Sequence, residues 1–124
     1  CGGVIGMGAT VEPQVGAANF RVTCTNVPPG AHGIVAMGDA VSGYPDPTFG
    51  LRVYLTAAAP LLTLTSDAGG AASFALPIPS LPQLVGLTAT LQSFWLPPPT
   101  AGNTCSPALF HLASSRGLTL TIQR

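Results

Sequence analysis

The sequence contains no lysine, and only eight of its 124 residues carry a formal charge: four Arg, three Asp and one Glu. Charged residues make up 6% of the chain, against about 25% in a typical globular domain. The formal net charge is zero, so the chain has no basic surface with which to bind nucleic acid or an anionic membrane. Hydrophobic residues account for 47%, which excludes a disordered chain, because disorder pairs low hydrophobicity with high charge.

Ionisable side chains are too few to indicate an active site. Acid–base catalysis needs two positioned ionisable groups, and no Gly-x-Ser-x-Gly elbow or phosphate-binding glycine loop is present. His32 and His111 are isolated, and the cysteine spacings match no zinc pattern. We therefore expect no enzyme activity, no catalytic residues, no cofactor and no metal.

Long apolar runs are also missing. The richest segment, residues 53–64, is interrupted by Pro60 and by threonines, so no transmembrane helix is predicted. With so little charge, a lone monomer has an unusually neutral surface. We expect much of that surface to be buried against copies of the same chain.

Hydrophobic periodicity is two, which is the period of β-strands. Phe20, Val22 and Cys24 alternate with polar residues, and the same alternation recurs at 51–56, 87–93 and 118–123. Weaker strands are predicted at 4–10, 31–40, 61–66, 71–78 and 109–114, with Asp67–Gly70 forming a hairpin turn. The whole chain, 1–124, is predicted to be one antiparallel β-sandwich of 8–9 short strands, Ig-like or jelly-roll-like; an up-and-down barrel is the alternative.

Two segments allow a second interpretation. Ser106, Pro107 and Gly117 have the positions of helix-capping residues, so a short helix near 107–114 is the alternative to a strand there. Residues 1–10 are either an ordinary first strand or an intersubunit strand that pairs with a neighbouring sheet edge. In the second case the apolar contacts would come from Val4, Ile5 and Met7.

The three cysteines are predicted to include one disulfide, Cys24–Cys105, as expected for an exported protein. The alternative is two buried free thiols. Cys1 is then unpaired, and three interpretations stay open: a lipid anchor, an intersubunit disulfide, or pairing with Cys24 that leaves Cys105 free.

Part of the sequence resembles a β-sandwich module of secreted proteins from planctomycetes and related bacteria. The similarity covers mainly residues 65–124 and lies in the segments 65–79 and 84–92 and in Ser115, Gly117, Leu118 and Ile122. The resemblance implies a β-sandwich fold and export, and no assigned chemistry. The chain departs from the module in its three cysteines.

These expectations point to an exported, extracellular or cell-surface structural protein that associates with itself into a fibre, sheath or surface layer. The alternative is a carbohydrate-binding or accessory module that contacts glycans or the cell surface. Its sugar platform would come from exposed aromatic rings, for which Trp95, Tyr44 and Tyr54 are the candidates. Core packing is the competing role for Trp95, since it and Phe94 lie on opposite faces of one strand.

Overall fold

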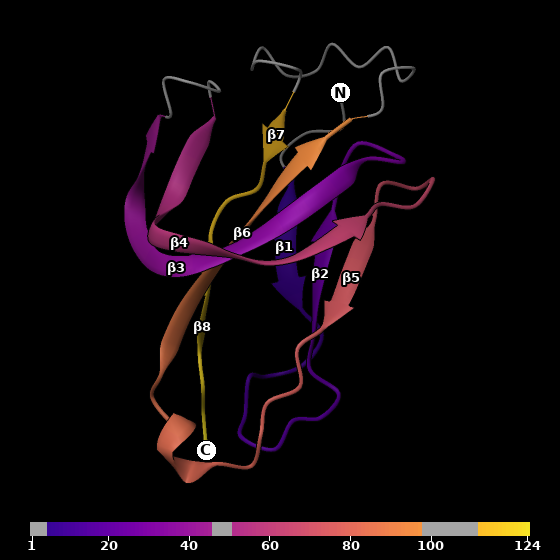
Figure 1. Cartoon of the computed structure of the whole chain (residues 1–124). Helices are drawn as coiled ribbons and strands as arrows, with labels where there is room; N and C mark the ends of the chain where they lie inside the picture. Colours follow the sequence, from indigo (N-terminus) through magenta and orange to yellow (C-terminus); the bar gives the residue numbers. More distant parts are fainter. Residues whose placement is uncertain (1–4, 46–50, 98–111) are drawn as a thin grey trace.

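The fold is an all-β sandwich of two antiparallel sheets (Figure 1). A computed structural model describes residues 5–45, 51–97 and 112–124. The smaller sheet has the order β1-β2-β5; in the larger one, β4-β3-β6 is followed by β7 and β8, which both pair with β6. The strands are β1 Gly6–Ala9, β2 Arg21–Thr25, β3 His32–Pro45, β4 Arg52–Thr65, β5 Ala72–Ala75, β6 Thr88–Leu96, β7 Ala113–Ser114 and β8 Leu118–Thr121.

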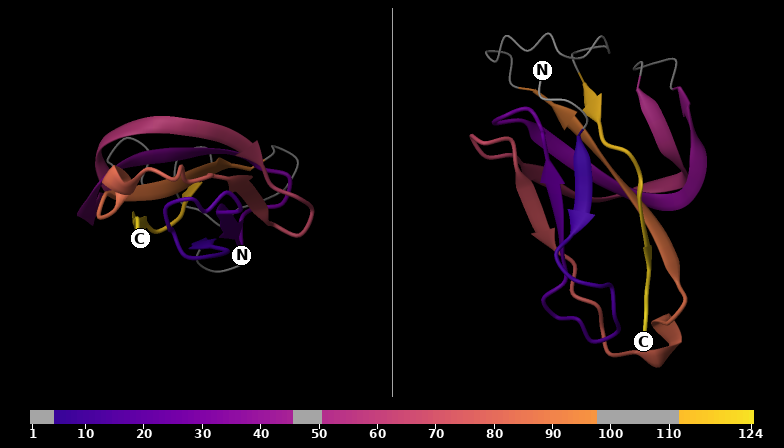
Figure 2. Two further views of the ribbon diagram at one scale, coloured as in Figure 1. Left: turned by 90° about the horizontal axis from the view of Figure 1, so that it is seen from below. Right: turned by 180° about the vertical axis from the view of Figure 1, so that it is seen from behind.

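The hydrophobic core lies between the two sheets, which appear as two layers in the left view of Figure 2. Strand β2 shows why these residues form this structure. Phe20, Val22 and Cys24 point inward and are fully buried, while Arg21 and Thr25 on the opposite face are exposed. The alternation read from the sequence is therefore confirmed, since one face of an antiparallel sheet packs on the core and the other meets solvent.

The sequence predicted separate strands at 51–56 and 61–66, but they are one continuous strand, β4, of 14 residues. Pro60 does not interrupt it, because β4 is an edge strand and Pro60 lies at a register shift of the β3–β4 ladder, and both are places where a sheet accepts proline. Three register shifts occur along the β3–β4 pair, between Val35 and Ala36, between Met37 and Asp39, and between Ala40 and Tyr44. Such irregularities bend a ladder, and the distal half of this hairpin curls away from the sheet (Figure 1).

The turn at Asp67 was predicted to close a hairpin, and this was wrong. The strands it joins, β4 and β5, belong to different sheets, so the turn is an arch between layers. The turn chemistry itself is as predicted: the Asp67 carboxylate accepts hydrogen bonds from the backbone N–H groups of Gly69 (2.8 Å) and Ala71 (3.0 Å). At Gly70, φ is 76° and a Cβ would lie 2.4 Å from the Val27 carbonyl oxygen, so this position requires glycine.

The sequence left two interpretations open for residues 107–114 and for residues 1–10, and the structure describes part of each segment. Ala113 and Ser114 form strand β7, and no α-helix occurs in 5–45, 51–97 or 112–124; residues 107–111 lie outside these ranges. β1 pairs with β2 of its own chain, and Ile5 packs into the core, as an ordinary first strand would. Val4 lies outside the described residues, and strand exchange between copies stays a prediction.

No helix within the described ranges is long and apolar enough to cross a membrane.

Candidate functional site

Trp95 is not a ligand platform: its side chain is 0% exposed. It points from β6 toward the smaller sheet and packs with Cys24, Val27 and Ala31. Its Nε1–H donates to Ser93 Oγ at 2.9 Å, which satisfies the polar end of the buried ring. The competing prediction, core packing, is confirmed for this residue.

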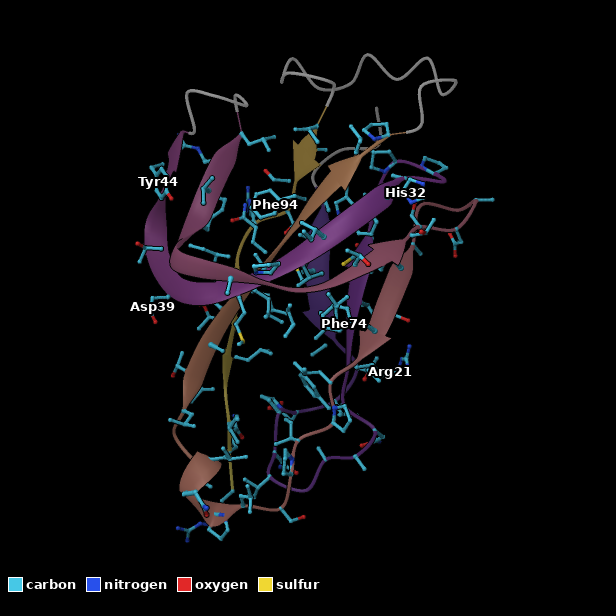
Figure 3. All side chains as sticks on the ribbon, viewed as in Figure 1. Arg21, His32, Asp39, Tyr44, Phe74 and Phe94 are labelled. Atoms are coloured by element: carbon cyan, nitrogen blue, oxygen red, sulfur yellow. The ribbon has the colours of Figure 1, made fainter. Side chains whose placement is uncertain are left out.

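Of the other two candidate aromatics, only Tyr44 exposes its ring. It lies on the curled hairpin, at the opposite end of β3 from His32 (Figure 3), and is 46% exposed, with its hydroxyl donating to the Leu55 carbonyl at 3.1 Å. Tyr54 is half-buried: a Cβ placed on Gly43 or Gly117 would touch it. The three aromatics therefore do not form a common platform.

Ionisable groups are dispersed, as far as residues 5–45, 51–97 and 112–124 show. They contain no cluster of three or more His, Cys, Asp or Glu side chains able to hold a metal ion. The Asp67 carboxylate is occupied by its own turn. His32 Nδ1 lies 3.3 Å from Thr65 Oγ1 on the neighbouring strand. His111 lies outside the described residues. The expectation that this protein is not an enzyme stays a prediction.

Gln92 was missed by sequence reasoning. It is fully buried although it lies on the face of β6 opposite Trp95. The curled hairpin covers it: the Tyr54 N–H donates to Gln92 Oε1 at 2.9 Å, and Gln92 Nε2 donates to the carbonyls of Arg52 (2.8 Å) and Ser115 (2.9 Å). One side-chain amide thus joins β4, β6 and the chain between β7 and β8.

Cys24 is fully buried and forms no disulfide within the described ranges, which contain no other cysteine. Its predicted partner Cys105 lies outside the described residues, as does Cys1, so both the disulfide and the role of Cys1 stay predictions. Burial raises the pKa of the Cys24 thiol above its usual value, and a hydrogen bond with Ser93 offsets part of that effect. The thiolate is the reactive form of cysteine. Burial and the raised pKa therefore both make Cys24 unreactive in the folded protein.

We expect Cys24 to resist alkylation by iodoacetamide at pH 8 in the folded protein and to react rapidly in denaturant without reductant. The measurement is mass spectrometry of the peptide that contains Cys24. A cysteine-containing peptide added to the same sample is the control for reagent activity. If Cys24 reacts in denaturant only after reduction, the thiol is in a disulfide, as the sequence predicted.

The outer face of the larger sheet carries a shallow depression of about 540 Å³. The β-ladder arranges its side chains in two rows across neighbouring strands. Thr65, His32, Leu96 and Leu112 form one row, and Thr63, Ile34 and Phe94 the next. Ile34 is 38% and Leu96 46% exposed, and none of the described residues that line the depression is Asp, Glu or Arg.

The apolar residues of this depression could have been identified from the sequence. Once Trp95 is assigned to the core, the period of two places Phe94 and Leu96 on the opposite, outer face. What the sequence did not show was which strands would be neighbours. His32 and Ile34 join the same surface only because β3 pairs with β6.

The chain was compared with family models, with curated proteins and with solved structures, and none of the three comparisons found a match.

Proposed function

We propose that this protein is an exported, non-enzymatic structural subunit that associates with copies of itself into an extracellular fibre, sheath or surface layer. The observation that carries this proposal is the outer face over β3, β4 and β6. It combines exposed Ile34 and Leu96 with half-buried Phe94, and the part of its lining that the structure describes contains no Asp, Glu or Arg.

The energetics of such a face favour association. Burying apolar surface contributes about 25 cal/mol per Å² removed from water. The main opposing cost at most protein surfaces is desolvation of charged groups, which is large for an unpaired ion. Among the described residues, the polar groups that a contact through this face would desolvate are the threonine hydroxyls and the His32 ring, with no carboxylate or guanidinium.

A second copy is the partner that the chain's composition favours. A partner recognised by charge complementarity would need charged groups here to meet its own. A copy of this chain brings an equally neutral, apolar surface, so two such faces match without an unpaired charge. This isologous contact is the commonest type in soluble oligomers.

We expect sedimentation velocity to show species larger than a monomer as the concentration rises through the micromolar range. Because no ion pair holds the contact, the size distribution should change little between about 0.05 and 1 M NaCl. The variant Ile34→Lys should weaken association at least tenfold, since it would bury an unpaired ammonium in the contact. Gln83→Lys adds the same charge at an exposed position of the 3₁₀ turn Pro82–Leu84 and should behave as the wild type.

A monomer that persists at about 100 μM would overturn the proposal. If that monomer bound glycans, the alternative function, a carbohydrate-binding or accessory module, would be favoured instead, and Tyr44 would be the first contact residue to test.

A further inference from the structure

We propose that the free edge of β1 pairs with the β1 edge of a second copy, in antiparallel orientation about a two-fold axis, to join two three-stranded sheets into one of six strands. This inference rests on the proposed function and names the contact through which copies meet.

Within the described ranges, one side of β1 has no hydrogen-bonding partner strand. Thr10 N–H donates to the Arg21 carbonyl at 3.0 Å, so Thr10 faces β2. Hydrogen bonds in an antiparallel pair alternate along the strand, so Gly8 and Gly6 also face β2. The backbone N–H and C=O groups of Met7 and Ala9 therefore point away from β2, toward the open edge.

A groove runs beside this edge. One wall is formed by Ile5, Gly6 and Met7, and the other by Arg116 and Gly117, around a volume of about 460 Å³. In the right view of Figure 2, β1 lies next to the chain that leads into β8. The groove gives an added strand access to the unpaired groups. Arg116 is exposed in the free chain, so a strand added along β1 would lie beside its guanidinium.

On the solvent face of β1, no side chain obstructs the approach of a second strand, because that face consists of Gly6 and Gly8. On the inner face, Met7 packs against both clusters of the core. Two copies aligned about Met7 would place Met7 opposite its own equivalent and Ala9 opposite Ile5 of the partner. This register satisfies about six backbone groups on each copy and extends the core contact through the two methionines.

The other edges of the two sheets carry features that oppose strand addition. β4 contains Pro60 and lies along a ladder with three register shifts. Over β5, Arg21 Nη2 donates to Ser73 Oγ at 3.1 Å, which places a charge beside that strand. At the end of β8, Gln123 is already paired on its outer side with residues 13–15.

No such feature protects β1, which has no charge, no proline and no bulge. Unprotected edges of this kind are templates for strand addition. The partner follows from symmetry: an identical edge offers the same pattern of donors and acceptors in reverse, so each unpaired group finds its complement.

A two-fold contact at β1 closes a dimer and cannot by itself build a fibre. The outer face of the larger sheet lies on the opposite side of the sandwich from β1, β2 and β5. Two different two-fold contacts, one through each surface, produce an open chain of subunits. The proposal therefore predicts two separable contacts.

Two substitutions test the β1 contact. Ala9→Pro removes only an N–H that faces the open edge, so the β1–β2 ladder keeps its hydrogen bonds. Gly8→Lys adds a charge to the edge strand; its Cβ would lie 3.7 Å from Thr23 Oγ1, an ordinary contact. Gln83→Lys adds the same charge at an exposed position of the 3₁₀ turn, outside both proposed contacts, and is the matched control.

Sedimentation velocity and hydrogen exchange measure the outcome. We expect Ala9→Pro and Gly8→Lys to stop assembly at a dimer held by the outer face, and Ile34→Lys to stop it at a dimer held by β1. The double variant Gly8→Lys/Ile34→Lys should be a monomer with wild-type circular dichroism. The amides of Met7 and Ala9 should exchange rapidly in that monomer and at least tenfold more slowly in the wild-type assembly.

Wild-type assembly by both edge variants, with rapid exchange at Met7 and Ala9 in the assembly, would overturn the β1 contact and leave the proposed function standing. A wild-type protein that is monomeric at all concentrations would overturn the proposed function. If Ala9→Pro unfolds the domain, Gly8→Lys and the exchange measurement still decide the question, because neither depends on a proline being accepted.

Discussion

Replacing Gln92 by methionine is expected to lower the free energy of unfolding by about 3–5 kcal/mol. The two side chains have similar lengths, so the substitution leaves no large cavity. Its effect comes from the partners: the N–H of Tyr54 and the carbonyls of Arg52 and Ser115 each lose a hydrogen bond of 2.8–2.9 Å. Each buried polar group left unsatisfied costs about 1–3 kcal/mol. The Tyr54 N–H is only partly buried and the Arg52 carbonyl keeps Ser114 Oγ as a donor at 3.4 Å, so these two lie at the lower end of that range.

The measurement is chemical denaturation followed by tryptophan fluorescence, since Trp95 lies in the core. Gln83→Met is the matched control, because Gln83 is exposed, and it should change the free energy of unfolding by less than about 0.5 kcal/mol. Hydrogen exchange should show the loss of protection concentrated in residues 39–45 and 52–56, the curled part of the hairpin. A loss below about 1 kcal/mol would mean that water replaces the amide and that Gln92 does not hold the hairpin.

Gly33→Ala is expected to destabilise the domain by about 2–3 kcal/mol through overpacking. The added Cβ would lie 2.5–2.7 Å from three carbons of the Trp95 indole. The indole cannot withdraw, because it is fully buried and its Nε1–H is fixed to Ser93 Oγ. A second strand glycine provides the comparison: at Gly8 the nearest atom to an added Cβ is 3.7 Å away, so Gly8→Ala should be neutral or slightly stabilising.

A double-mutant cycle separates the contact with Trp95 from other effects of the alanine. Trp95→Phe removes part of the ring that the new Cβ would meet, so Gly33→Ala should cost at least 1 kcal/mol less in the Trp95→Phe background than alone. Because Trp95→Phe removes the fluorescent probe, circular dichroism follows unfolding in all four proteins. Strict additivity would show that the cost of Gly33→Ala arises from the backbone and not from the indole.

The sequence by itself determined the secondary structure class and the orientation of individual strands. The period of two at Phe20, Val22 and Cys24 places these three side chains in the core, because a strand with one buried face admits only one alternation. The same rule places Trp95 and Phe94 on opposite faces of β6. The turn chemistry of Asp67 is also local: its carboxylate bonds to amides two and four residues away.

The tertiary structure decided which elements are neighbours, and with it the candidate surfaces. The Asp67 turn has the same local hydrogen bonds whether it joins paired strands or strands in separate layers, so its residues could not distinguish a hairpin from an arch. The burial of Gln92 depends on groups 23 to 40 residues away in the sequence. The open edge of β1 is likewise defined by its single partner strand. Periodicity and turn chemistry act over a few residues, whereas these contacts arise only when distant segments pack, and no local pattern encodes which segments will meet.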